Sequence, residues 1–267
     1  MPIEQATISP MDRGFLFGDG VYEVMARVGG RIRAKSLHQE RLQSSLDAIG
    51  LSVLVDDVFT DVDRLTEKAG LSDAKIYIQV TRGAASARDH AFPSKISPTV
   101  FLTISEFAAV SQKPATAIVR PDIRWRRNSI KSVSLLGNVL LMQEARESGA
   151  QEAILYHDNM VTEASTSNVF VIRSRCLITP PLSDLILPGI TRHLVIEMAS
   201  TVGLDVVEEP IRIDSLPDAD GVFVSSSTRG LMPIVELDPG GQVGGGQLTQ
   251  VFMALQAAYD KRLHHHE

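Results

Sequence analysis

The sequence has a single cysteine, Cys176, and aromatic residues make up only 5% of its 267 residues. One cysteine excludes an internal disulfide and a zinc site built on thiolates, and it is typical of a reducing compartment. No apolar run approaches the roughly 18 residues of a membrane helix, and no basic and then apolar leader opens the chain. The net charge of −6 provides no basic field for nucleic acid or anionic lipid. We therefore expect a cytoplasmic enzyme or small-molecule binder without a metal, nucleic-acid or membrane site.

The hydrophobic pattern of the first hundred residues alternates between strands and helices. It predicts, in order, a hairpin at residues 21–34, a helix at 37–49, a helix capped by Asp56 or Asp57, and strands at 75–81 and 99–107. Two helices beside an antiparallel sheet predict an α+β domain over residues 1–109.

The second half of the chain is richer in short strands. Strands are predicted at residues 117–120, 152–156, 169–173, 176–179, 206–211 and 221–225, and helices at 135–147, 190–202 and 248–262. Before this half, residues 110–114 lose periodicity and end in a proline, so we place a linker there and a second domain at 115–267. A small-molecule site commonly lies where two domains meet.

Lys131 is the first candidate for chemistry. Most lysines are solvated surface charges, and this interpretation stays open for Lys131. Its apolar neighbours Ile130 and Leu135 favour instead a partly buried amine, which loses its proton more readily and can then attack a carbonyl group.

Two segments have the features of a phosphate site. Leu187–Thr191 leads into a predicted helix whose first N–H groups would bind an anion, although an ordinary helix start has the same pattern. Ser225–Thr228 places four hydroxyl residues directly after an apolar strand, either in a turn or in a second wall of an anion site. Arg41 on the first predicted helix has the permanent charge that a phosphate needs, unless it is simply exposed.

Two polar segments remain. Thr162–Asn168 is either a hairpin turn or the place from which Glu163 would hold a proton on a heterocyclic nitrogen. Residues 82–90 form either a solvated connection or a loop whose Arg88 and His90 converge on a carboxylate. An amine, an acid and two phosphate walls agree on one cofactor, pyridoxal 5′-phosphate, which has an aldehyde, a ring nitrogen and a phosphate.

Four separated motifs resemble those of one protein family. They are DRGFLFGDGVYEV (Asp12–Val24), IKS around Lys131, TEASTSN (Thr162–Asn168) and LPGITR (Leu187–Arg192). Their order and spacing resemble the class IV aminotransferases, the fold-type IV pyridoxal-phosphate enzymes. The resemblance implies a small α/β domain, a larger β-barrel-like domain with flanking helices, and a homodimer with a shared active site.

The resemblance also implies a role for each cofactor-binding residue. Lys131 would form the covalent link to the cofactor and then act as the acid and base that moves the proton. Glu163 would keep the pyridine nitrogen protonated, and Leu187 would lie against the ring. The phosphate would be held by Arg41, Ile190, Thr191 and Ser227, the second and third partly through their backbone N–H groups.

Within the family, two longer stretches are similar to the branch that acts on D-amino acids. They are IYIQVTRGAASARDHAFP (Ile76–Pro93) and DIRWRRNSIKSVSLLGNVL (Asp122–Leu140). That branch traps the substrate carboxylate with a tyrosine, an arginine and a histidine, here Tyr22, Arg88 and His90, the last two from the partner subunit. The implied reaction transfers the amino group of a D-amino acid to a 2-oxo acid, as in D-alanine plus 2-oxoglutarate giving pyruvate plus D-glutamate.

The chain departs from the family pattern in three places, one of which is Asp89 between Arg88 and His90. It opens about a strand short of the pattern, so we expect either that an edge strand of the small domain is absent or that the sequence is a shortened form. Arg229 follows the hydroxyl run where the branch has a small residue, and its charge would lie near the cofactor. Two other reactions stay open: transamination of branched-chain L-amino acids or (R)-amines, and the aminodeoxychorismate lyase reaction, which releases pyruvate without an amino acceptor.

Overall fold

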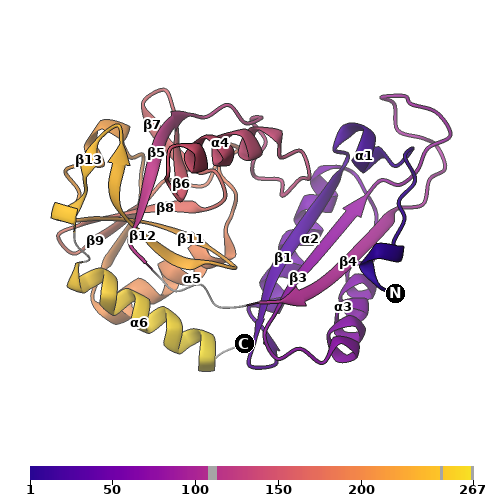
Figure 1. The fold of residues 1–267 in the computed structure, drawn as a ribbon, viewed down its shortest axis with the longest axis horizontal. Coiled ribbons are helices and arrows are strands. Elements are labelled where there is room, and N and C mark those ends of the chain that lie inside the picture. Colours follow the sequence, from indigo (N-terminus) through magenta and orange to yellow (C-terminus); the bar gives the residue numbers. More distant parts are fainter. Residues whose placement is uncertain (108–112, 247–248, 266–267) are drawn as a thin grey trace. The chain divides into compact units, whose positions relative to one another are not determined.

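The computed structural model describes residues 1–107, 113–246 and 249–265, and it divides into two compact units (Figure 1). The first unit comprises Met1–Ala108 and Ile130–Ser134, and the second comprises Ala109–Ser129 and Leu135–His266. The short segment that contains Lys131 therefore packs in the first unit, although both of its flanks belong to the second. The predicted linker at 110–114 lies largely outside the described residues. Within the described ranges, no helix has the length and apolar character to cross a membrane.

The first unit is an antiparallel sheet of four strands, in the order β2-β1-β3-β4, with two long helices packed on one face (Figure 1). The predicted hairpin, helices and strands all form. Gly29 and Gly30 have positive φ angles of 56° and 83° in the hairpin turn, a conformation that glycine adopts without strain. The elements are η1 Ile3–Gln5, α1 Arg13–Phe17, β1 Gly20–Val28, β2 Arg31–Ile32, α2 Lys35–Ala48, α3 Val55–Ala69, β3 Ala74–Thr81 and β4 Thr99–Glu106.

The core of the first unit lies between the sheet and these two helices. Leu42 of α2 and Phe59 of α3 pack against Ile76 of β3, all of them fully or almost fully buried. The predicted helix cap at Asp56 or Asp57 is wrong. Helix α3 begins earlier, with Leu54 as its N-cap, so both aspartates lie in the first helical turn, where their negative charge favours the helix dipole.

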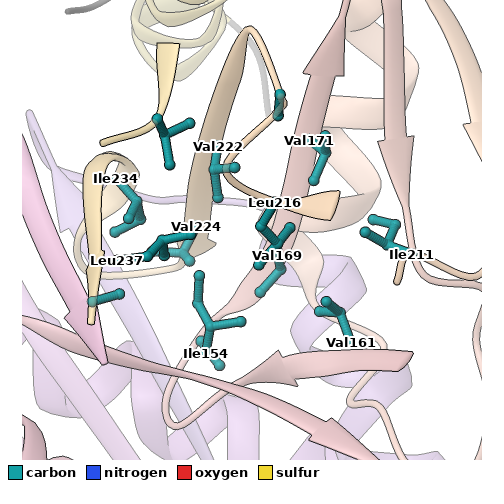
Figure 2. Close-up of a cluster of buried hydrophobic side chains, with 14 of the residues drawn as sticks. Ile154, Val161, Val169, Val171, Ile211, Leu216, Val222, Val224, Ile234 and Leu237 are labelled. Carbon is teal, nitrogen blue, oxygen red and sulfur yellow. The ribbon is translucent and has the colours of Figure 1, made fainter. Parts of the chain in front are cut away.

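The second unit is a sheet of nine strands that curls around a buried apolar core (Figure 2). Eight strands run in the order β10-β9-β8-β11-β12-β5-β6-β7, and β13 pairs with β12. Helices α5 and α6 cover one face of the sheet, and α4 packs against β5 and β6. The elements are β5 Ala115–Pro121, α4 Leu136–Glu147, β6 Glu152–His157, β7 Met160–Ala164, β8 Asn168–Arg173, β9 Cys176–Thr179, α5 Ile190–Ala199, η2 Ser200–Val202, β10 Asp205–Glu208, η3 Ile213–Ser215, β11 Gly221–Ser226, β12 Gly230–Asp238, β13 Gly241–Gln242, η4 Gly244–Gly246 and α6 Gln250–His265.

Three local predictions for this unit need correction. The strand predicted at 206–211 ends at Glu208, two residues before Pro210, which has no N–H group to donate to a neighbouring strand. Strands β7, β12 and β13 are absent from the set of predicted strands. Because β7 extends to Ala164, Glu163 lies on a strand and only the residues after Ala164 form the predicted turn. The broader prediction, an α+β fold with a small unit and a curled, barrel-like one, is confirmed.

Candidate active site

Lys131 and Tyr22 lie side by side in the first unit. The backbone of Lys131 accepts a hydrogen bond from the Tyr22 N–H at 2.9 Å, and its own N–H donates to Ser45 Oγ at 3.2 Å. These bonds fix the segment against strand β1. The Lys131 side chain is half-buried, and its Nζ lies 4.1 Å from the centre of the Tyr22 ring, a cation–π contact. Two of the predicted site residues are therefore neighbours.

Arg41 is buried, so the alternative of an exposed arginine is wrong. Its Nε and Nη2 donate to the two carboxylate oxygens of Glu23, at 2.7 and 2.8 Å, and His38 Nδ1 lies 2.7 Å from Glu23 Oε2. Burial alone would raise the pKa of Glu23, but the charge and hydrogen bonds of Arg41, with the bond to His38, outweigh it and hold the pKa well below its usual range. Burial lowers the pKa of His38. The result is an ion pair of one carboxylate and one guanidinium.

Glu163 is the buried acid of the second unit. Its Oε1 accepts a hydrogen bond from Arg124 Nη1 at 2.5 Å, and its Oε2 accepts bonds from Asn168 Nδ2 at 2.9 Å and the Leu187 N–H at 3.1 Å. The side chain is almost completely buried. Burial raises the pKa of Glu163 to about 7 despite the positive charge of Arg124.

Arg124 has to serve a second carboxylate as well. Its Nε and Nη2 donate to the two oxygens of Asp122, at 2.9 and 2.7 Å, and Thr162 Oγ1 donates to Asp122 Oδ2 at 2.8 Å. Two buried acids therefore share one cation. Arg124 binds both oxygens of Asp122 but only one oxygen of Glu163. Sequence reasoning missed Arg124, which lies 39 positions before Glu163. The spacing Asp-x-Arg in the stretch DIRWRRN was the available signal.

The predicted phosphate segment Leu187–Thr191 begins helix α5, with Gly189 as its N-cap. Among the described residues, no side-chain hydrogen bond caps this helix. A Cβ at Gly189 would lie 1.9 Å from Asn168 Oδ1, so any larger residue would displace the Asn168 side chain. Asn168 Nδ2 also donates to the Leu187 carbonyl at 2.9 Å. The same asparagine thus ties the start of the phosphate segment to Glu163.

The second predicted phosphate wall follows strand β11. Ser227 is half-buried in the turn after that strand. The neighbouring Ser225 is fully buried, and its hydroxyl has no hydrogen-bond partner in the part of the chain that the structure describes. Because buried polar groups normally have a hydrogen-bond partner, this hydroxyl is available to a polar group that binds here.

Arg229 pairs with a further buried acid, Glu152. Arg229 Nη2 lies 2.6 Å from Glu152 Oε2, and Glu152 is completely buried. The same carboxylate accepts hydrogen bonds from the hydroxyls of Ser165, Thr166 and Ser167. Arg229, which departs from the family pattern, therefore joins the turn after Glu163 to the turn that contains Ser227.

Arg88 and His90 are exposed residues whose side chains both contact the ring of Phe17. The Arg88 guanidinium carbon lies 4.8 Å from the centre of the Phe17 ring, and the His90 ring centre lies 5.2 Å from it. Phe17 ends the short helix α1. The structure thus brings two of the three residues of the predicted carboxylate trap together within the first unit, whereas the third, Tyr22, lies beside Lys131.

The sequence of residues 20–237 matches the model of the family described as amino-transferase class IV. This chain belongs to the class IV aminotransferases. It is 36% identical to the D-alanine aminotransferase of Staphylococcus epidermidis over 272 residues, which cover 98% of this chain and 95% of that protein. It is 37% identical to the D-alanine aminotransferase of Listeria monocytogenes over 255 residues, covering 91% and 86%. These matches confirm the family that the four motifs indicated.

The fold of this aminotransferase is also that of solved structures. The branched-chain amino acid aminotransferase of Escherichia coli superposes with a TM-score of 0.91, at 24% identity, and the match covers 100% of this chain and 93% of that one. At this identity the likeness concerns the fold alone. Class IV aminotransferases use pyridoxal phosphate, so the cofactor prediction is confirmed together with the family.

The described residues of this aminotransferase fit pyridoxal phosphate. Glu163 Oε1 accepts a single hydrogen bond from Arg124, which leaves one of its lone pairs for a pyridinium N–H. A glycine-capped helix start and an unsatisfied buried hydroxyl at Ser225 suit a phosphate group.

Proposed function

We propose that this protein transfers the amino group of a D-amino acid such as D-alanine to a 2-oxo acid such as 2-oxoglutarate. Arg88 and His90, gathered on the ring of Phe17, are the observation that carries the choice of substrate. By the resemblance, this Arg-x-His pair belongs to the branch that acts on D-amino acids and not to the branched-chain enzymes or the lyases. The relatives in Staphylococcus and Listeria, which are D-alanine aminotransferases, support the same assignment.

Each predicted residue has a defined part in this reaction. When bound, pyridoxal phosphate supplies an electron sink for negative charge at the substrate α-carbon. Glu163 would hold the proton on the pyridine nitrogen. Lys131 Nζ would be the base that takes the proton from the substrate α-carbon and the acid that delivers it to the cofactor carbon at the other end of the transferred nitrogen. Leu187 would lie against the cofactor ring. The phosphate would be bound by Arg41, Ile190, Thr191 and Ser227.

The substrate carboxylate would be bound by Tyr22 together with Arg88 and His90, the last two from the second subunit of a homodimer. An exposed apolar face on helix α4 supports a dimer. Leu136, Val139 and Leu140, spaced as neighbours on one side of the helix, are 71%, 59% and 53% exposed. An apolar stripe of this kind is typical of a surface that a second copy covers.

A visible absorption spectrum of the holoenzyme tests the substrate class. D-Alanine alone should bleach the cofactor band, and L-leucine should leave it unchanged. Bleaching by L-leucine alone would assign the protein to the branched-chain reaction, and release of pyruvate from aminodeoxychorismate without an acceptor would assign it to the lyases. In the same assay, Lys131→Ala should show no turnover.

Mixing two inactive variants tests the shared site. Lys131→Ala and Arg88→Ala should each have little activity with D-alanine. After subunit exchange, a mixed dimer has one site with both a native Lys131 and a native Arg88, so a 1:1 mixture should recover about a quarter of the wild-type activity. No recovery, with exchange verified by mass spectrometry, would show that both residues act within one chain.

A further inference from the structure

Arg13 is a buried arginine that the proposed reaction does not use. It is the first residue of helix α1, and only 3% of it is exposed. Its Nε donates to Asp19 Oδ2 at 2.8 Å. Since an arginine cannot lose its charge in a protein, such a burial requires that the remaining N–H groups also have partners.

Those partners are three successive carbonyl groups of one loop. Arg13 Nη1 donates to the carbonyl of Asp89 at 2.6 Å and to that of Ala91 at 3.2 Å, and Nη2 donates to the carbonyl of His90 at 3.2 Å. A guanidinium has a rigid plane of N–H donors, so these bonds fix the orientation of three consecutive peptide groups. They therefore also fix the direction in which the His90 side chain leaves the backbone.

The loop has little structure of its own. Residues 82–98, all of which are described, contain no helix or strand apart from a single bridge between Asp12 and Ala84. A connection of this length needs contacts from outside to hold one conformation. Among the described residues, residues 88–90 have one hydrogen bond within the loop, from the Ala91 N–H to Asp89 Oδ1 at 3.1 Å.

Helix α1 is itself tied to both ends of this loop. The N-cap Asp12 accepts hydrogen bonds from Thr81 Oγ1 at 2.9 Å and Thr99 Oγ1 at 2.7 Å, the last residue of β3 and the first of β4. The Arg13 N–H donates to the Gly83 carbonyl at 2.9 Å. At its other end the helix presents Phe17, on which Arg88 and His90 lie. Arg13 thus connects a rigid base to the tip of the loop.

We propose that Arg13 is a positioning residue for the substrate carboxylate, acting through Arg88 and His90. This inference rests on the proposed function, in which those two side chains bind the carboxylate. Arg13 touches neither substrate nor cofactor. It holds the loop backbone so that the two cationic side chains stay together on Phe17, and it removes the entropic cost of ordering the loop when substrate binds.

The test uses the half-reaction of the holoenzyme with D-alanine and with D-alaninol, which has the same amine and no carboxylate. Arg13→Lys keeps the charge but has too few donors, in the wrong geometry, for three carbonyls and Asp19. It should raise the apparent Kd for D-alanine about tenfold or more, while the Kd for D-alaninol changes by less than about twofold. The limiting rate constant with D-alanine should change much less than the Kd.

Arg82→Lys is the matched control. Arg82 is as buried as Arg13, pairs with the same oxygen of Asp19 at 2.8 Å, and stacks on Phe92. Arg82 is the first residue of the loop, but its other N–H groups bind the carbonyls of Ile49 and Gly50 rather than those of Asp89, His90 and Ala91. A lysine at this position also retains a cation for the contact with Phe92. A general loss of stability would affect both variants alike, whereas loop positioning predicts that only Arg13→Lys changes the ratio of the two Kd values.

Arg88→Ala distinguishes a failure of the inference from a failure of the proposed function. If Arg88→Ala changes the ratio and Arg13→Lys does not, the positioning role is wrong and the carboxylate trap stands. If Arg88→Ala leaves the ratio unchanged, the trap is wrong and the role of Arg13 falls with it. Should Arg13→Lys fail to fold, Asp19→Asn weakens the same anchor, and an unchanged ratio in that variant would equally overturn the inference.

Discussion

The two units each bury an arginine against carboxylates, but with opposite effects on the acid. In the first unit, Glu23 has both oxygens bound by Arg41, and the pKa of Glu23 is well below its usual range. In the second, Arg124 binds both oxygens of Asp122 and only one of Glu163, and burial raises the pKa of Glu163 to about 7. The number of acids that share each cation decides the difference.

This difference suits the part of the cofactor that each cluster would meet. The first cluster is neutral overall and fixes Arg41 in the orientation from which it would donate to a phosphate in the proposed function. The second cluster has two acids for one cation, so it lacks one positive charge. A protonated pyridine nitrogen supplies a positive charge of that kind, and we expect cofactor binding to complete the second cluster while it only adds to the first.

The largest effect is expected from Glu23→Gln. The substitution leaves the Arg41 guanidinium buried without its charge partner, so the free energy of unfolding of the apoprotein should fall by about 3–5 kcal/mol, as urea titration measures. Because the pKa of Glu23 is lower in the folded protein, its stabilisation is present above pH 4.5 and is lost as the pH falls. The difference in the free energy of unfolding between the variant and the wild type should therefore become smaller at acidic pH. Glu67→Gln, at an exposed position of α3, should change stability by less than about 0.5 kcal/mol.

The same substitution at Glu163 should act on turnover instead. A neutral amide cannot hold a proton on the pyridine nitrogen, so kcat with D-alanine should fall about a thousandfold, equivalent to roughly 4 kcal/mol in the barrier. Cofactor content, measured after denaturation, should fall far less because the phosphate contacts remain. A kcat within tenfold of the wild type would show that Glu163 does not control the ring nitrogen.

Glu163→Gln should also stabilise the apoprotein, the reverse of Glu23→Gln. The pKa of Glu163 is higher in the folded apoprotein than in the unfolded chain, so its contribution is present below pH 4.5 and is lost as the pH rises through about 7. At pH 8 the variant should therefore be more stable than the wild type, by up to roughly 3 kcal/mol, and at pH 4 the two should be equal. Equal stability at both pH values would mean that Arg124 compensates Glu163 fully.

The sequence identified the residues of these clusters unevenly. Lys131, Glu163 and Arg41 were predicted as site residues because each residue type has a chemistry that the cofactor needs, and two of the family motifs contain Lys131 and Glu163. Arg124 and Arg13 were missed because their partners are distant in sequence: Arg124 lies 39 positions from Glu163, and Arg13 lies 76 from Asp89. Hydrophobic periodicity reports which face of an element is buried, and it contains no information on which charges will meet.

The same reason explains the errors of local structure. The cap predicted at Asp56 or Asp57 followed residue type. Val55, however, packs into the core of the first unit as a helical residue, so the helix begins before both aspartates. Strand β7 was not predicted because its second half, Thr162 to Ala164, is polar and small. That polarity has a cause outside the strand: Thr162 and Glu163 face buried Asp122 and Arg124. Where a strand buries polar side chains in such a network, its sequence lacks the hydrophobic pattern by which a strand is predicted.

The smallest effect is expected from Arg229→Met, which tests the environment of a further buried acid, Glu152. Glu152 retains the three hydroxyl donors and the Ala153 N–H when Arg229 is removed, so more of its hydrogen bonds survive than for Glu23 or Glu163. Arg229 is also partly exposed, at 26%, and water screens its charge. The free energy of unfolding should fall by about 1 kcal/mol, with a few-fold faster release of pyridoxal phosphate, because the turns near Glu163 and Ser227 lose their link. Arg229→Lys should restore most of the stability but not the slow release, since one ammonium cannot bridge both turns. A loss as large as that of Glu23→Gln would show that hydroxyl groups do not substitute for a cation at a buried carboxylate.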